Sequence, residues 1–311
     1  MRFTATLLLA LALGPAAAAA DKLTLMLDWF ANPDHAPIYV ALESGYFADA
    51  GLDVVIQEPA DPNDPPKLVA AGRADIAITY QPNLYMQVDQ GLPLVRFGTL
   101  ISTPLNMLLA LDDGPVKSIA DLKGKRIGYS VGGFEEAVLK TMLESSGLTL
   151  ADVSLVNVNF SLAPSLMAGN VDAVIGAYRN FELNILDLEG RKGRAFMVED
   201  HGVPLYDELI FVARRDEMQS DTRYARFLDA IERGVAKLAN DPEGAWALFV
   251  NDRPKLDDEL NRRAFRDTLP RFAASPAALD ARRYARFARF MKEQGVIGEA
   301  KPVSAYAVAL E

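Results

Sequence analysis

The chain has 311 residues, of which 50% are hydrophobic and 24% charged, and its formal net charge is −10. This negative charge does not attract nucleic acid or an anionic membrane surface, so neither is expected as a direct partner. The chain contains no cysteine, which excludes disulfides, thiol catalysis, cysteine-ligated metals and a lipid-modified cysteine.

The first twenty residues predict a secretory signal peptide, residues 1–20. Arg2 is the only charged residue of this stretch, residues 7–13 are apolar, and small residues end at Ala20. A membrane anchor, the alternative, would need about 20 apolar residues in a row. We therefore expect a periplasmic protein that is not lipid-anchored.

The following segments predict α/β structure. We expect a strand at 23–27, a helix with Asp34 as N-cap and Pro37 in its first turn, a helix end at Gly45, and a strand at 52–56. This β-α-β order favours a parallel sheet with helical crossovers.

One unit occurs twice, at 64–80 and at 164–178. Each copy has a short helical segment, a Gly-x-x-Asp turn and an apolar strand that ends in a tyrosine, Tyr80 or Tyr178. Open α/β sheets bind ligands outside the carboxyl ends of their strands. The two tyrosines are therefore expected to face each other across a cleft, the alternative being that each caps its own core.

The chain is long enough for two lobes. We place a crossover near 109–114 and a return near 209–213, which gives a discontinuous first lobe, 21–110 plus 210–311, and a second lobe, 111–209. Each lobe should contain a mixed, mostly parallel sheet flanked by helices. The later part of the chain predicts helices at 222–240, 242–250, 257–268 and 276–294.

Two segments carry a family resemblance. Residues 27–37 (LDWFANPDHAP) and 58–67 (EPADPNDPPK) resemble the formylaminopyrimidine-binding proteins of thiamine-precursor ABC importers, within the thiamine-pyrimidine-synthase-like, type II periplasmic binding protein superfamily. The similarity covers nearly the whole chain after residue 20. It implies a Venus-flytrap fold, an aminopyrimidine ligand between the lobes, and an ABC permease with its ATPase as partners of a monomeric binding protein.

The resemblance also leaves an enzyme open, because pyrimidine-forming synthases share this fold. As the resemblance implies, those synthases carry a cysteine-rich, iron-associated loop and a histidine that reacts. Here cysteine is absent and His35 and His201 are the only histidines, so we expect binding without catalysis and without a cofactor. Riboflavin, a sulfonate or nitrate remain alternative ligands.

An aminopyrimidine is a flat ring with polar edges, which suits aromatic walls and a carboxylate. Trp29, Tyr80 and Tyr178 are the candidate walls. Glu182 is the favoured carboxylate, because on a helix it would face the same side as Tyr178. Its alternative is a surface glutamate paired with Arg179 or Lys192.

Three polar residues of the segment 27–37 are further candidates. Asp28 is the second candidate carboxylate, or else it orients Asn32 or the backbone. Asn32 offers both a donor and an acceptor to a formylamino group, and His35 adds one hydrogen bond or else caps the helix. The two histidines have no metal-ligand spacing, so no metal site is predicted.

Gly132 and Gly133 allow close approach of the backbone at a helix start, where anions often bind. Glu135 and Glu136 follow in the first turn and would repel an anion. The segment therefore predicts a contact with an uncharged or cationic ligand.

Overall fold

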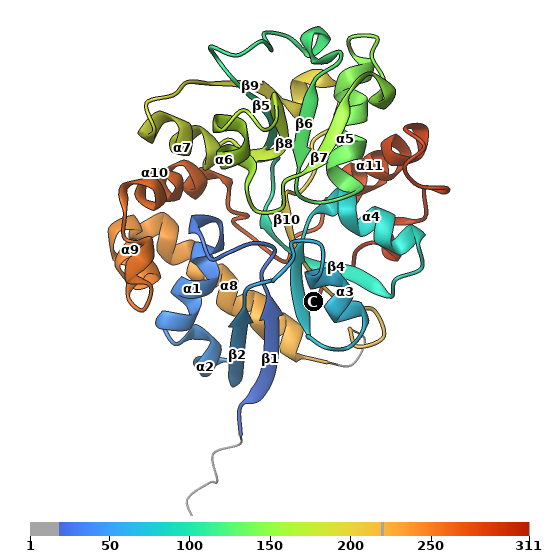
Figure 1. Ribbon diagram of the computed structural model, residues 1–311. Helices are drawn as coiled ribbons and strands as arrows, with labels where there is room; N and C mark the ends of the chain where they lie inside the picture. Colours follow the sequence, from blue (N-terminus) through green and yellow to red (C-terminus); the bar gives the residue numbers. More distant parts are fainter. Residues whose placement is uncertain (1–18, 219–220, 311) are drawn as a thin grey trace, which may run out of the picture.

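The structure, a computed structural model, describes residues 19–218 and 221–310. The predicted signal peptide lies outside the described residues apart from residues 19 and 20. Two five-stranded sheets form two lobes, one above the other in Figure 1. Within the described ranges, no helix has the length and apolar character needed to cross a membrane.

The first lobe contains a sheet made from both ends of the chain. Its strands are β1 (Asp21–Met26), β2 (Leu52–Gln57), β3 (Ile76–Thr79), β4 (Leu94–Ile101) and β10 (Leu209–Arg214). They are ordered β2-β1-β3-β10-β4. β1 is parallel to β2 and β3, whereas β10 runs antiparallel to β3 and β4. The sheet is therefore mixed, and β10 is the strand that returns from the second lobe.

The second lobe repeats this plan with the middle of the chain. Its strands are β5 (Asn106–Leu111), β6 (Arg126–Tyr129), β7 (Ser154–Asn157), β8 (Ala173–Tyr178) and β9 (Gly193–Met197). They are ordered β7-β6-β8-β5-β9. β6 is parallel to β7 and β8, and β5 is antiparallel to β8 and β9.

The first crossing between the sheets lies between β4 and β5, upstream of the predicted 109–114. The apolar stretch from 94 to 111 forms two strands because Ser102-Thr103-Pro104 interrupts it, and Pro104 has no N–H for a ladder bond. The side chains of β5 then enter two cores. Leu108 and Ala110 belong to the larger one and Met107 and Leu109 to the smaller, since alternate side chains of a strand point to opposite faces.

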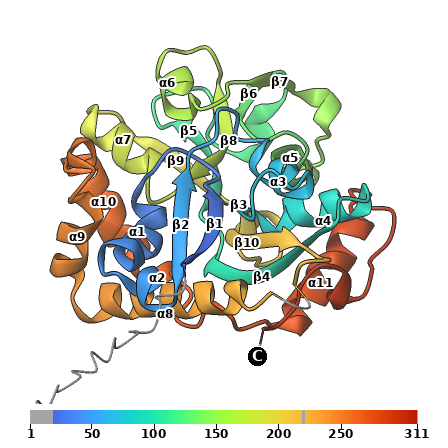
Figure 2. The same cartoon turned by 90° about the horizontal axis from the view of Figure 1, so that it is seen from below.

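Helices flank both sheets. Those of the first lobe are α1 (Ala36–Glu43), α2 (Tyr46–Asp49), α3 (Pro65–Ala70), α4 (Gln81–Asp89), α8 (Arg223–Asn240), α9 (Pro242–Val250), α10 (Glu259–Thr268) and α11 (Ala281–Glu293). Those of the second are α5 (Phe134–Glu144), α6 (Leu162–Met167) and α7 (Glu182–Leu188). Figure 2 shows α8 running along the first sheet, with α9 and α10 toward one end and α11 toward the other.

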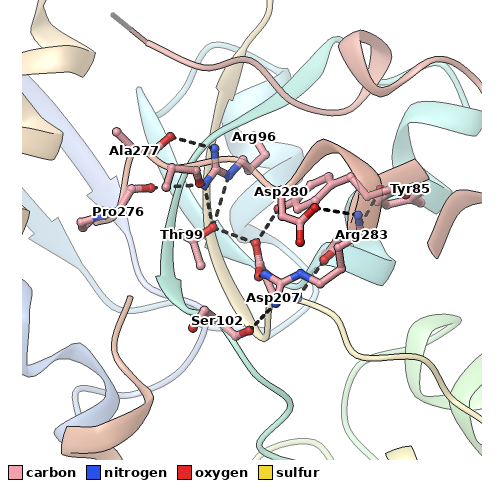
Figure 3. A network of polar contacts seen from close by, with 12 residues as sticks. Tyr85, Arg96, Thr99, Ser102, Asp207, Pro276, Ala277, Asp280 and Arg283 are labelled. Carbon is pink, nitrogen blue, oxygen red and sulfur yellow. Dashed lines mark hydrogen bonds and ion pairs between the residues drawn. The ribbon is translucent and has the colours of Figure 1, made fainter. Parts of the chain in front are cut away.

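Asp207 anchors the returning crossover segment to the first lobe. Its carboxylate accepts from the hydroxyls of Thr99 on β4 (2.8 Å) and Tyr284 on α11 (2.8 Å), and it pairs with the guanidinium of Arg283. Figure 3 shows this cluster beside the fully buried Arg96. Buried charges are stable only when they are paired and hydrogen-bonded, so this network holds β4, α11 and the crossover in one arrangement.

Candidate ligand-binding site

A cavity lies between the two lobes, at the carboxyl ends of β1, β3 and β8. It encloses about 520 Å³ of empty space, part of it open to solvent. Seven of the predicted site residues line it: Asp28, Trp29, Asn32, His35, Tyr80, Tyr178 and Glu182. Both lobes thus contribute to one site, as a strand-end arrangement requires.

Asp28 organises the wall from the first lobe. Its two carboxylate oxygens lie 2.9 Å from Nε2 of His35 and 2.9 Å from the hydroxyl of Tyr80. Nδ1 of His35 accepts the backbone N–H of Asn32 (3.3 Å), so Nε2 carries the hydrogen and donates it to Asp28. Burial, with the charge of Asp28 next, raises the pKa of Tyr80 well above its usual value. Tyr80 therefore stays a neutral donor, and Asp28 positions both neighbours.

Asn32 caps the turn that precedes α1. Its Oδ1 accepts the N–H of Asp34 (2.8 Å), and its Nδ2 donates to the carbonyl of Phe30 (3.0 Å). Both ends of this amide are therefore engaged by its own loop, although the residue lines the cavity. The prediction that Asp34 is the helix cap is wrong. His35 occupies the N-cap position of α1, and Asn32 caps the short 3-10 turn before it, because a short polar side chain can bond N–H groups just ahead of it.

Glu182 and Tyr178 come together at the end of β8. Oε2 of Glu182 accepts the backbone N–H of Tyr178 at 2.6 Å. Tyr178 ends the strand and Glu182 begins α7, so a turn rather than a helical repeat joins them. Burial raises the pKa of Glu182 to about 7. Arg179, the alternative partner, pairs instead with Glu199 at 2.7 Å.

The cavity is also lined by seven residues that the sequence did not predict as site residues. They are Asp34, Asn106, Phe134, Glu135, Leu162, Gly176 and Phe181. Glu135 was expected in the first turn of a helix as a group that repels anions; it is 3% exposed, and its Oε2 accepts the backbone N–H of Ser130 at 2.7 Å. Gly176 offered the one sequence signal, because a glycine inside a strand pattern often marks a bulge.

Gly132 and Gly133 lie outside this cavity. The N–H of Gly132 donates to Oδ1 of Asn63 in the first lobe (3.0 Å), at a separate cavity that also contains Lys67. Gly133 has φ +81°, and a Cβ there would lie 2.6 Å from Cε of Met86. The two glycines thus let the lobes approach each other. Neither lines the cavity that contains the other predicted residues, so their predicted ligand contact stays a prediction.

Acidic side chains dominate the polar lining. Asp28, Asp34, Glu135 and Glu182 line the cavity, whereas none of the described residues that line it is lysine or arginine. Burial raises the pKa of Asp34 to about 6 and that of Glu135 to about 8. Such a site favours a ligand that donates hydrogen bonds or carries positive charge, and it disfavours an anion.

Aromatic rings from both lobes meet beside Trp29, which lines the cavity. The ring of Trp29 lies 4.5 Å from that of Phe160, edge to face, and the ring of Phe30 lies 4.3 Å from that of Phe160. Phe30 remains 47% exposed. Edge-to-face and tilted pairs are favourable contacts, so these rings help to hold the two lobes together.

The comparisons with known proteins agree with this geometry. The family described as NMT1/THI5 like matches residues 32–245. The chain is 53% identical over 294 residues to a thiamine biosynthesis protein of Haemophilus influenzae, covering 94% of this chain and 93% of that protein. It is 36% identical over 244 residues to the formylaminopyrimidine-binding protein of Halalkalibacterium halodurans, covering 78% and 73%.

More distant similarities reach both enzymes and binding proteins. A 4-amino-5-hydroxymethyl-2-methylpyrimidine phosphate synthase of Legionella pneumophila is 27% identical over 281 residues, covering 90% of this chain and 88% of the synthase. The alkanesulfonate-binding protein of Xanthomonas axonopodis superposes with a TM-score of 0.73 at 17% identity, covering 94% of this chain and 99% of that one. The expected type II periplasmic binding protein fold is therefore confirmed.

Proposed function

The chain belongs to the NMT1/THI5-like family, and from this premise we propose that it captures a thiamine-derived aminopyrimidine for an ABC importer. The ligand would be N-formyl-4-amino-5-aminomethyl-2-methylpyrimidine or a close relative. The protein would work in the periplasm as a monomer and deliver the pyrimidine to a membrane permease and its ATPase for thiamine salvage.

This chain is a thiamine-related member of its family with the fold of a solute-binding protein. The ligand, the importer and the location are the parts that we propose.

The composition of the cavity carries the proposal. Trp29, Tyr80 and Tyr178 supply aromatic faces, and the acidic groups are joined by no lysine or arginine among the described lining residues. A flat ring with an exocyclic amine can stack on such faces and donate to Glu182. Nitrate or a sulfonate would meet several carboxyl groups and no cationic side chain among the described lining residues, so these alternatives are less well supported.

Closure of the lobes is the proposed mechanism. The two lobes contact each other through Asn63 and Gly132, and through Asp34 and Asn180. A ligand that touches both lobes stabilises this closed arrangement, and a permease that recognises it would accept only loaded protein.

A pyrimidine-forming enzyme is the second candidate, because synthases belong to the same group of relatives. The histidine of the cavity argues against it. His35 is fully buried, and both ring nitrogens are engaged, by Asn32 and Asp28. No nitrogen is left to react with a substrate, so we propose that the protein does not turn the pyrimidine over.

Purification of the mature protein from its native host tests the proposal. Native mass spectrometry should detect a bound species, and its release by denaturation should yield a pyrimidine of the expected mass. A co-purified riboflavin, sulfonate or nitrate would contradict the ligand. Conversion of the added pyrimidine with turnover would contradict the binding role.

A further inference from the structure

Glu208 holds the outgoing crossing with its side chain. It ends the returning crossing, directly before β10, and it is fully buried. Its Oε2 accepts the backbone N–H groups of Leu105 (2.6 Å) and Asn106 (2.9 Å), which lie where the outgoing crossing ends and β5 begins. The carboxyl group of one crossing therefore joins it to the backbone of the other.

The backbone next to Glu208 is fixed to the first lobe. The side chain of Asp207 is held by β4 and α11, as described above, and its backbone N–H donates to Oε1 of Gln81 on α4 at 2.7 Å. Because adjacent residues move together, Glu208 reaches the outgoing crossing from the first lobe.

Arg179 fixes the same part of the outgoing crossing to the second lobe. Its Nε donates to the carbonyl of Leu105 (3.2 Å), and its Nη2 donates to the carbonyl of Asn106 (3.1 Å). The guanidinium also pairs with Glu199 of the second lobe at 2.7 Å. The two residues thus have their carbonyl groups bound by the second lobe and their N–H groups bound by Glu208 of the first.

The other oxygen of Glu208 contacts a wall of the ligand cavity. The hydroxyl of Tyr178 donates to Oε1 of Glu208 at 3.4 Å, which is long for a hydrogen bond between oxygens. Tyr178 ends β8 of the second lobe and lines the cavity. Burial chiefly, and the charge of Glu208 next, raise the pKa of Tyr178 well above its ordinary value, so the phenol remains a donor. One hydrogen bond therefore separates a wall of the cavity from the crossing.

A rotation of the lobes affects the contacts of Glu208 unequally. Leu105 and Asn106 lie at the crossing itself, where a hinge motion displaces atoms least. Tyr178 belongs to the strand end of the lobe that moves, and its long contact with Glu208 weakens steeply when the two oxygens separate further. The contact with Tyr178 is therefore the one that depends on the angle between the lobes.

We propose that Glu208 is a positioning residue that couples occupancy of the cavity to closure of the lobes, with the hydroxyl of Tyr178 as the link. A ligand that packs against the ring of Tyr178 holds the hydroxyl on Glu208, and this contact favours the closed arrangement of the crossing. The inference rests on the proposed function and adds the residues through which binding closes the lobes.

A double-mutant cycle on the mature protein tests the link, with N-formyl-4-amino-5-aminomethyl-2-methylpyrimidine as the probe. Tyr178→Phe keeps the ring and removes the hydroxyl, and Glu208→Gln keeps an oxygen for the two backbone N–H groups and removes the charged acceptor. By calorimetry, each variant should bind about tenfold more weakly. The double variant should also lose about tenfold, because both substitutions remove the same contact. A loss of about a hundredfold in the double variant, or unchanged affinity in both single variants, would overturn the proposal.

Closure is measured separately, by the distance between two spin labels. The chain has no cysteine, so Asp229→Cys on α8 and Ala168→Cys at the end of α6, both at exposed positions, place one label on each lobe. In the ligand-free protein, the Tyr178 and Glu208 variants should shift the distribution of distances to the same extent. This measurement needs no ligand. Failure of the unmodified protein to bind the pyrimidine would overturn the proposed function, whereas a distribution that neither variant changes would overturn the coupling.

Tyr224 and Glu217 provide the matched control. The hydroxyl of Tyr224 donates to Oε2 of Glu217 at 2.7 Å within the first lobe, and neither residue lines the cavity. Tyr224→Phe and Glu217→Gln remove a hydrogen bond of the same kind and should leave the affinity and the label distances unchanged.

Thermal melts verify that each variant is folded. A lower melting temperature of the Tyr178 and Glu208 variants, with affinity and label distances unchanged, would reduce Glu208 to a structural role and overturn the proposal. If Glu208→Gln does not fold, Tyr178→Phe alone decides, because the proposal requires this variant to change both the affinity and the label distances.

Discussion

The carboxylate of Asp34 in the first lobe accepts a hydrogen bond from the amide of Asn180 in the second, with 2.6 Å between Oδ1 and Nδ2. The hydroxyl of Thr268 on α10 accepts from Nδ2 of Asn180 (2.7 Å) and donates to Oδ1 of Asp34 (3.0 Å). All three side chains are buried. This buried contact joins the two lobes beside the cavity.

Loss of the Asn180 amide should favour the open state. We expect Asn180→Leu to weaken ligand binding about tenfold, because a buried hydrogen bond to a carboxylate contributes about 1.5 kcal/mol and Asp34 then keeps only Thr268 as a donor. Calorimetry measures the affinity, and small-angle scattering should show a larger radius of gyration for the ligand-free variant.

Asn184 offers the matched control for Asn180. Its Nδ2 also reaches the first lobe, at Oδ2 of Asp267 (2.8 Å), but this contact is exposed. Asn184→Leu should therefore change affinity little. An Asn180 variant that binds as tightly as the unmodified protein would contradict the assigned role.

The stability of the ligand-free protein should fall as pH rises. Burial raises the pKa of Asp34 to about 6, those of Glu182 and Glu208 to about 7, and that of Glu135 to about 8. In this range the folded protein binds more protons than the unfolded chain, so the free energy of unfolding decreases with increasing pH. The stabilisation is complete near pH 4 and is lost progressively as pH rises through these folded-state pKa values, from about 6 to above 8.

Thermal melting between pH 5 and pH 8 measures this effect. Glu135→Gln keeps an acceptor for Ser130 and removes the group with the highest of these pKa values, so its melting temperature should depend less on pH between about 7 and 8. A melting temperature of the unmodified protein that rises steadily toward pH 8 would contradict the expectation.

Glu182 should contribute directly to ligand affinity. Glu182→Gln retains an oxygen for the N–H of Tyr178 and loses the charged acceptor, so we expect affinity for the aminopyrimidine to fall about tenfold to hundredfold. Glu189→Gln, at the exposed end of the same helix, is the control and should bind normally. Unchanged binding by the Glu182 variant would remove it from the site.

Trp29 should report ligand binding by its fluorescence. The chain has two tryptophans, and the other, Trp246, packs against Phe249 and Phe265 at α9 and α10. Ligand stacking changes the surroundings of Trp29 alone. Trp246→Phe should keep the fluorescence response to ligand and Trp29→Phe should abolish it; the reverse pattern would place the ligand elsewhere.

The sequence predicted the cavity correctly for residues whose position follows from the local strand pattern. Tyr80 and Tyr178 follow apolar strands, so strand-end placement brings them to one cavity. Glu135 was not selected as a lining residue, because its position in the first turn of α5 indicates only an interaction with the helix dipole. Its burial comes from the way the loop before α5 packs, with the N–H of Ser130 donating to it. Asn106 could not be found, since its orientation depends on the bulge at Gly176 and thus on the register between β5 and β8, which local sequence does not determine.

The crossover illustrates the same limit. The strands on either side of Ser102-Thr103-Pro104 are both apolar, and only the hydrogen-bonding partners of β4 and β5 reveal that they belong to different sheets. Asp207 likewise has no local signal, because its partners Thr99 and Tyr284 are distant in sequence.

Calorimetric titration of the full chain with N-formyl-4-amino-5-aminomethyl-2-methylpyrimidine tests the central claim most directly, with an alkanesulfonate and nitrate titrated in parallel. The account predicts saturable one-to-one binding of the pyrimidine and no heat of binding from either anion, because the cavity presents acidic and aromatic groups. Binding of an anion together with no response to the pyrimidine would contradict it.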